Sequence, residues 1–149
     1  MRVLFVCHGN TCRSPAAQAL VRHTCPHIET DSAGVSADRV TAPPTPAMRA
    51  LVEAEGVDMS DLQARRITPG DFKDFDLIIA MDYDVLAQLK RLRPIGATAK
   101  MEGFMDYMPG ATVSEIADPW HTGDYPAAFE LIRQAADAFV DALKDQPRQ

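Results

Sequence analysis

The sequence has few cysteines and no long apolar run. Three cysteines in 149 residues are too few, and odd in number, for a framework of disulfide bonds. No stretch approaches the roughly 20 consecutive apolar residues that a membrane-spanning helix needs. The apolar run after Arg2 is also too short for the hydrophobic part of a secretory signal. We therefore expect a cytoplasmic protein, whose thiols stay free, with no membrane partner.

Positive charge is also scarce. The 15 Lys and Arg residues are outnumbered by 21 Asp and Glu residues, which gives a formal net charge of −6. This balance argues against a nucleic-acid partner. An anionic substrate would need a local cluster of hydrogen-bond donors to overcome repulsion by the net negative charge. The hydrophobic content of 46% is typical of a globular protein. The length predicts a single domain over residues 1–149, and we expect a monomer.

Strand and helix patterns alternate along the chain. Apolar runs predict four strands, at 2–7, 28–34, 75–81 and 99–104. Helical spacing predicts helices at 14–23, around 48–54, at 83–92 and from Tyr125 onward. Prolines and glycines predict irregular loops at 41–46 and 105–123. This alternation indicates an α/β fold with a parallel sheet covered by helices on both faces.

The segment after the first predicted strand carries the most chemistry. It reads Cys7-His8-Gly9-Asn10-Thr11-Cys12-Arg13 and leads into Ser14-Pro15. Ser14 is a favourable helix N-cap and Pro15 suits the first helical position, so a helix is expected to begin there. A loop between a strand and a helix offers free N–H groups and the positive end of the helix dipole.

Cys7 and Arg13 together indicate attack on phosphorus. The thiol can act as a nucleophile, and the guanidinium is a planar fork that fits phosphate oxygens. Gly9 and Asn10 adopt left-handed backbone conformations at little cost, so they can curl the loop until its N–H groups converge on an anion. The same donors would stabilise a thiolate at Cys7. The alternative is that Cys7 is simply a small buried side chain.

The run at 6–15 resembles the signature of the low-molecular-weight protein tyrosine phosphatases. Further segments resemble parts of that family in the same order along the chain, at 31–34, 64–68, 75–82 and 118–120. The resemblance implies a flavodoxin-like three-layer sandwich with a central four-stranded parallel sheet. It also implies an enzyme that removes phosphate from phosphotyrosine in phosphorylated proteins, with no cofactor and no metal.

The resemblance assigns a role to each residue of the expected site. Cys7 would form a cysteinyl-phosphate, and Arg13 would hold the oxygens of the transferring phosphoryl group. Asp118 would protonate the leaving oxygen and then activate water, which predicts a bell-shaped pH profile with an acidic optimum. Ser14 would donate to the sulfur, and Trp120 would stack on the substrate ring. The remaining residues of the phosphate-binding loop would be His8, Gly9, Asn10, Thr11 and Cys12.

The same loop is compatible with other functions. Thr11 is a resemblance to the protein-arginine phosphatases of this family, which also carry Thr at this position, whereas most of the tyrosine phosphatases carry Ile there. An arsenate reductase would need a cysteine pair downstream, but no cysteine follows Cys25 and Ala80 fills the end of the third predicted strand. A non-catalytic phosphate-binding module would normally have lost the thiol, the arginine or the acid. The thiols and imidazoles match no common zinc site.

Several residues near the site have more than one possible role. Cys12 is either a redox partner that protects oxidised Cys7 as a disulfide or a packing thiol. His8 departs from the family pattern, and it either lines the pocket wall, tunes Cys7, or is solvated or hydrogen-bonded elsewhere. Asp82 either anchors the loop that contains Asp118 or caps a helix. Arg65 and Arg66 support a loop, attract acidic substrates or form a solvated face, whereas Cys25 is expected to be structural or incidental. Asp38 is expected on the pocket rim, where many relatives have an aromatic residue.

Overall fold

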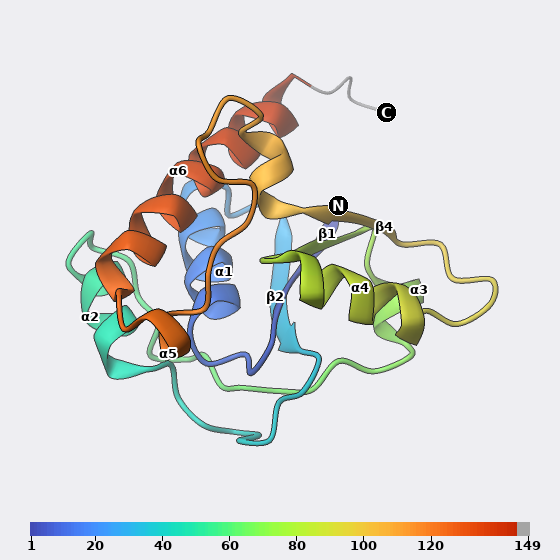
Figure 1. The fold of residues 1–149 in the computed structure, drawn as a ribbon. Helices are drawn as coiled ribbons and strands as arrows, with labels where there is room; N and C mark the ends of the chain where they lie inside the picture. The colour runs from blue at the N-terminus through green and yellow to red at the C-terminus, as the bar shows by residue number, and fades with distance from the viewer. Residues whose placement is uncertain (146–149) are drawn as a thin grey trace.

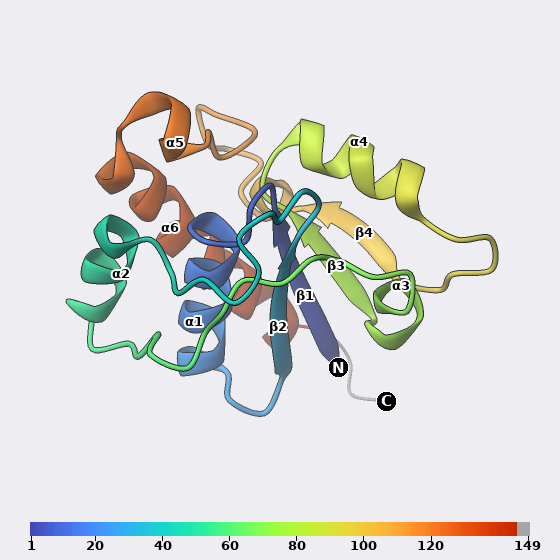
Figure 2. The same ribbon diagram turned by 90° about the horizontal axis from the view of Figure 1, so that it is seen from below.

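Four parallel strands form the centre of the computed structural model, which describes residues 1–145. The fold is drawn in Figure 1, and the order of the strands across the sheet, β2-β1-β3-β4, is seen in Figure 2. The strands are β1 (Arg2–Cys7), β2 (Glu29–Gly34), β3 (Leu77–Ala80) and β4 (Lys100–Gly103). The sequence therefore predicted all four strands, although it extended three of them by one or more residues.

Helices cover both faces of this sheet (Figure 2). One face carries α1 (Arg13–Thr24), α2 (Pro46–Glu53) and α6 (Tyr125–Lys144), and the other carries α3 (Asp71–Asp74) and α4 (Tyr83–Leu92). Alternate residues of β1 point to the two faces, as the period of a strand requires. Val3 and Phe5 belong to the core beneath α1 and α6, whereas Leu4 and Val6 belong to the core beneath α3 and α4. The predicted flavodoxin-like sandwich is confirmed.

The strand order creates a crevice where the site is expected. From β1 the chain passes through α1 to β2 on one side, whereas β3 pairs with the opposite edge of β1. Loops leaving neighbouring strands in opposite directions open a crevice at the carboxyl ends of the strands. Cys7 ends β1 and Asp82 follows β3, so both lie at this crevice.

The structure corrects two predictions about helix ends. Helix α1 begins at Arg13 with Cys12 as its N-cap, and Ser14 is not the cap because its hydroxyl bonds within the preceding loop. The segment 105–123 is not wholly irregular, since it contains the end of a 3₁₀ helix, η1 (Phe104–Tyr107), and the short helix α5 (Pro119–Thr122). Helix α5 forms because Asp118 caps it, and it ends at Gly123 with φ 74°.

The short helix α3 was not predicted, because four residues are too few to show helical spacing. Within residues 1–145, no helix combines the length and the apolar character needed to cross a membrane.

Candidate active site

The sulfur of Cys7 lies among hydrogen-bond donors at the end of β1. Its Sγ is 2.9 Å from the hydroxyl of Ser14 and accepts from the backbone N–H of Asn10 at 3.3 Å. Cys7 itself is buried, with 3% of its surface exposed. A buried sulfur surrounded by donors is suited to carry negative charge.

A chain of hydrogen bonds orients the hydroxyl group of Ser14 beside the sulfur of Cys7. The backbone N–H of Arg65 donates to Oδ1 of Asn10 at 2.8 Å, which fixes the orientation of the Asn10 amide. Its Nδ2 then donates to Ser14 Oγ at 2.8 Å. Because an amide nitrogen can only donate, Ser14 accepts from Asn10 and keeps its own proton free for Cys7. When Cys7 is a thiolate, the sulfur can therefore accept two hydrogen bonds, from Ser14 and from the N–H of Asn10.

The curled loop depends on Asn10 rather than on Gly9. Asn10 has φ 58°, in the left-handed region, whereas Gly9 does not have a positive φ. An asparagine tolerates this conformation because its short polar side chain bonds locally, as the contacts with Ser14 and Arg65 show. The prediction of a left-handed residue is confirmed for Asn10 and wrong for Gly9.

The side chain of Arg65 supports the loop from behind. Its guanidinium pairs with Asp31 on β2 at 3.0 Å and with Asp71 on α3 at 3.0 Å. Asp71 also accepts from the backbone N–H of Thr68 at 2.8 Å, which ties α3 to the segment that contains Arg65. Of the roles predicted for Arg65, loop support is the one that the contacts match.

Gly34 allows the end of β2 to approach the loop closely. A Cβ at this position would lie 2.7 Å from the carbonyl oxygen of His8 and 3.0 Å from the carbonyl carbon of Gly9. Both atoms belong to the backbone, so no side-chain movement could relieve the contact. The backbone N–H groups of Val35 and Ser36 then donate to the carbonyls of Cys7 and His8 at 3.1 and 3.0 Å.

Arg13 is buried and connects three separate segments of the chain. Its Nη1 donates to Asp82 Oδ2 and to the carbonyl of Ile116, both at 2.7 Å. Its Nη2 lies 3.5 Å from Oδ2 of Asp118. Burial opposes the charge, but the nearby sulfur and the two carboxylates outweigh it and raise the pKa of Arg13. The guanidinium therefore remains charged at the floor of the crevice.

Asp82 and Asp118 each have two roles. Asp82 caps α4 by accepting from the N–H of Val85 at 2.7 Å, while its other oxygen holds Arg13. The predicted helix cap is therefore confirmed, whereas Asp82 reaches the loop that contains Asp118 only through Arg13. Asp118 caps α5 by accepting from the N–H of Trp120 at 3.0 Å, while its other oxygen faces Arg13. The indole of Trp120 is 75% exposed.

Part of this arrangement lines a pocket of about 550 Å³. Most of the predicted site residues line it, namely Cys7, His8, Gly9, Thr11, Cys12, Arg13, Asp118 and Trp120. Asn10 and Ser14 do not line the pocket, because they lie behind the loop and hold it in shape. Asp38 lies on the wall, as expected. Sequence reasoning missed the remaining wall, formed by Arg39, Ala42, Pro43, Pro44, Thr45, Pro46, His121 and Tyr125.

One contact of the proline-rich segment 42–46, which forms part of the pocket wall, could not have been inferred from the spacing of residues in the sequence. The N–H of Thr45 donates to the carbonyl of Thr11 at 2.7 Å, which fastens the proline-rich segment to the phosphate loop. A run of prolines signals a loop but does not say against what it packs.

Cys12 shares the pocket but differs from Cys7 in its surroundings. Burial raises the pKa of the Cys12 thiol to about 12. The charges of Cys7 and Asp118 act in the same direction, and Arg13 only partly offsets them. Cys12 is therefore a protonated thiol at neutral pH, and all three cysteines are free.

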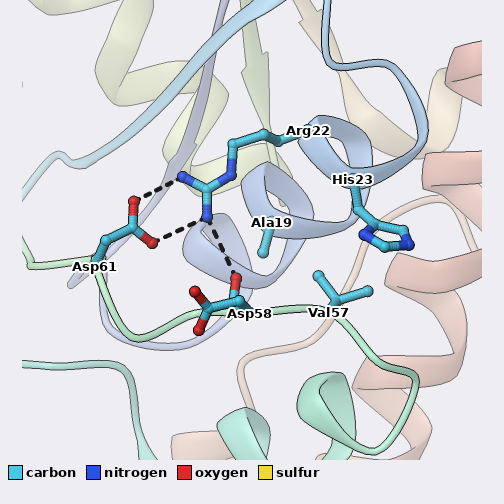
Figure 3. Close-up of a pocket in the computed structure, with 6 residues that line it drawn as sticks. All are labelled: Ala19, Arg22, His23, Val57, Asp58 and Asp61. Carbon is cyan, nitrogen blue, oxygen red and sulfur yellow. Dashed lines mark hydrogen bonds and ion pairs between the residues drawn. The ribbon is translucent and has the colours of Figure 1, made fainter.

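A second cavity, of about 330 Å³, lies between α1 and the segment after α2 (Figure 3). Its arginine, Arg22, is already neutralised by both oxygens of Asp61 at 2.9 and 3.0 Å and also donates to the carbonyl of Asp58. An incoming anion would have to displace this carboxylate, so the cavity is a poor phosphate site. No cluster of three or more potential metal ligands occurs within the described part of the chain.

Comparison with known proteins agrees with this geometry. A sequence model described as "Low molecular weight phosphotyrosine protein phosphatase" matches residues 2–149. The chain belongs to this family. It is therefore a hydrolase of the low-molecular-weight protein-tyrosine-phosphatase type, as its sequence predicted. A low molecular weight phosphotyrosine protein phosphatase of Schizosaccharomyces pombe is 35% identical over 130 residues, which cover 83% of each chain.

Solved structures of the family superpose closely on this fold. YfkJ from Bacillus subtilis, a low molecular weight protein-tyrosine-phosphatase, has a TM-score of 0.93 at 28% identity and covers 99% of this chain and 97% of its own. A Drosophila arginine phosphatase has a TM-score of 0.90 at 30% identity and covers 99% of this chain and 100% of its own. The shared fold thus accommodates relatives named for different phosphorylated residues.

Proposed function

We propose that this phosphatase hydrolyses phosphotyrosine in proteins through a cysteinyl-phosphate on Cys7, with Asp118 as the general acid and base. The observation that carries this proposal is the donor arrangement around the sulfur. Cys7 accepts from Ser14 and from the backbone of Asn10, and it lines the same pocket as Arg13 and Asp118. A nucleophile, an anion-binding group and an acid are thereby combined in one crevice.

The phosphate would bind at the mouth of the curled loop. Within the described residues, the N–H groups of Gly9, Thr11 and Cys12 donate to no other protein group, so they are free for phosphoryl oxygens. Arg13 already uses Nη1 for Asp82 and Ile116, which leaves the Nη2 side to face the substrate. These donors would stabilise the charge on the equatorial oxygens in the transition state.

The reaction would proceed in two steps through Cys7. In the first step the thiolate forms a bond to phosphorus, the bond from phosphorus to the tyrosyl oxygen breaks, and that oxygen takes the proton of Asp118. In the second step water attacks phosphorus and gives its proton to Asp118, while the bond to sulfur breaks. The hydroxyl of Ser14 stabilises the departing thiolate, and inorganic phosphate and the free enzyme are regenerated.

Phosphoarginine is the second candidate substrate. Thr11 lines the pocket and presents a hydroxyl where a larger apolar wall would favour an aromatic ring. The Drosophila relative is named an arginine phosphatase, and its fold is closely similar. Trp120 and Tyr125 also line the pocket and favour the ring of phosphotyrosine, and we therefore place that substrate first.

The test compares kcat/KM for matched phosphotyrosine and phosphoarginine peptides, with the wild type and with Thr11→Ile. We expect the wild type to prefer phosphotyrosine and Thr11→Ile to strengthen that preference. A wild-type preference for phosphoarginine that Thr11→Ile reverses would favour the second candidate. Failure to hydrolyse either peptide, with Cys7 intact and reduced, would contradict both.

A further inference from the structure

The position of Asp118 depends on a segment with little structure of its own. Between η1 and α5 the chain forms neither helix nor strand. From Met108 to Ser114, no side chain makes a hydrogen bond to any part of the described molecule. Met108 and Ala111 pack against the core, but the hydrogen bonds that hold the loop close to Asp118 are made by the segment 115–118.

Three hydrogen bonds attach this segment. The carboxylate of Glu115 accepts from the backbone N–H of Tyr83 at 2.9 Å. Ile116 is fully buried, its N–H donates to the carbonyl of Met81 at 3.0 Å, and its carbonyl accepts from Arg13 at 2.7 Å. Of these hydrogen bonds, only the one that Glu115 accepts uses a side chain of the loop, and the carboxylate of Asp118 in addition lies 3.5 Å from Arg13.

The loop and the arginine share one anchor, which is the first turn of α4. The N–H of Tyr83 bonds to Glu115, and the N–H of Val85 bonds to Asp82, whose other oxygen holds Arg13. Both carboxylates lie at the positive end of the helix dipole, which favours their charge. The acid and the phosphate-binding arginine are thereby held relative to the same helix end.

We propose that Glu115 is a positioning residue, which acts through Ile116 to aim Asp118 at the leaving oxygen. Glu115 does not line the pocket, so it touches neither the substrate nor the reacting atoms. The inference rests on the proposed function, because it requires Asp118 to be the acid. Removal of the carboxylate would leave Asp118 present but badly placed for proton transfer.

The test uses kcat/KM for two substrates with different leaving groups, which reports the first chemical step. Phenyl phosphate needs a proton on its leaving oxygen, whereas 4-nitrophenyl phosphate hardly does. We expect Glu115→Ala to lower kcat/KM for phenyl phosphate about tenfold, a small part of what general acid catalysis provides, and to change the value for 4-nitrophenyl phosphate by less than about twofold.

Two matched variants separate positioning from general damage. Glu115→Gln keeps an oxygen acceptor for the Tyr83 N–H, so it should restore most of the activity toward phenyl phosphate. Ser114→Ala alters the neighbouring position, whose side chain makes no hydrogen bond within the described residues, and should behave as the wild type. Equal losses for both substrates, no loss at all, or no rescue by Glu115→Gln would overturn the proposal.

The same assay distinguishes this proposal from the function on which it rests. Asp118→Ala should produce the same dependence on the leaving group, but more strongly, and adding Glu115→Ala to it should have no further effect. If Asp118→Ala leaves that dependence unchanged, the assignment of the acid fails. If Asp118→Ala changes it and Glu115→Ala does not, only the role of Glu115 fails.

Discussion

A chain of individual hydrogen bonds orients the groups around the sulfur of Cys7. The backbone N–H of Arg65 orients the amide of Asn10, and the amide leaves Ser14 free to donate to the sulfur. The Asn10 amide oxygen can only accept, and its nitrogen can only donate. In the proposed mechanism, the thiolate of Cys7 would therefore be stabilised in part by residues that do not line the pocket.

Ser14→Ala should slow the second chemical step more than the first, because the hydroxyl stabilises the thiolate as it leaves phosphorus. Loss of a hydrogen bond to a charged group costs about 1.5–3 kcal/mol, so we expect kcat to fall roughly 10- to 100-fold. Rapid-quench kinetics should show a burst of the released alcohol that exceeds the wild-type burst. An unchanged kcat would contradict this role.

Cys12 should be unreactive toward alkylation at neutral pH. With a pKa of about 12, the thiolate fraction of Cys12 at pH 7 is on the order of 10⁻⁵ and rises tenfold for each pH unit. Iodoacetamide followed by peptide mapping should modify Cys7 before Cys12, and inorganic phosphate should protect Cys7 alone. Modification of Cys12 at a rate equal to that of Cys7 would contradict the raised pKa of Cys12.

At the scale of secondary-structure elements, the phosphate loop is positioned by the neighbouring strand β2, whose end lies against it. The end of β2 passes so near the phosphate loop that Gly34 has no room for a side chain, and the carbonyls of Cys7 and His8 are held by the residues that follow it. The loop is therefore shaped by the neighbouring strand as well as by its own sequence.

Gly34→Ala should disturb the loop more than the fold. The added methyl group would overlap backbone atoms, and overpacking of this kind costs about 1–3 kcal/mol. We expect kcat/KM to fall at least about tenfold, while the free energy of unfolding in urea falls by no more than this cost. Gly110→Ala is the control, since a Cβ there meets no atom within 4 Å. Equal activity of the two variants would show that the close approach is unimportant.

The sequence predicts what is local and misses what depends on packing. The alternation of apolar runs predicted the four strands, and the loop after β1 could be recognised from Cys7, Asn10 and Arg13. Tyr125 and Thr45 could not be assigned to the pocket, because they reach it only when distant segments pack together. Ser14 was misassigned as a cap because the serine that suits a helix start also suits a bond to sulfur.

Across the whole molecule, contacts between distant segments connect stability to the site. Arg13 reaches the carbonyl of Ile116, 103 positions away along the chain. Near β4, the ring of Tyr107 packs edge-on against Phe139 of α6 at 5.0 Å, and its hydroxyl donates to Glu102. Tyr107 thus joins the outer strand of the sheet to the last helix.

Tyr107→Phe should destabilise the protein in a manner that depends on pH. Burial acts to raise the pKa of Glu102, but the hydrogen bonds from Tyr107 and Lys100 outweigh it and lower that pKa. A carboxyl group whose pKa is lower in the folded state than in the unfolded state stabilises the fold above about pH 4.3, and this contribution is lost as the pH falls through the folded-state pKa. We expect Tyr107→Phe to lower the free energy of unfolding by about 1–2 kcal/mol at pH 7 and by less in more acidic solution. Urea unfolding at several pH values measures this loss, and a loss independent of pH would contradict the explanation.

The most direct test of the central claim is to look for phosphate on Cys7. Asp118→Ala should slow hydrolysis of the intermediate but hardly slow its formation from 4-nitrophenyl phosphate, so acid quenching during turnover of that substrate should trap the enzyme with one phosphoryl group. Peptide mass spectrometry should place that group on Cys7, and Cys7→Ser should abolish both the adduct and turnover. Turnover by the Cys7→Ser variant at the wild-type rate, or a phosphoryl group on another residue, would contradict the account.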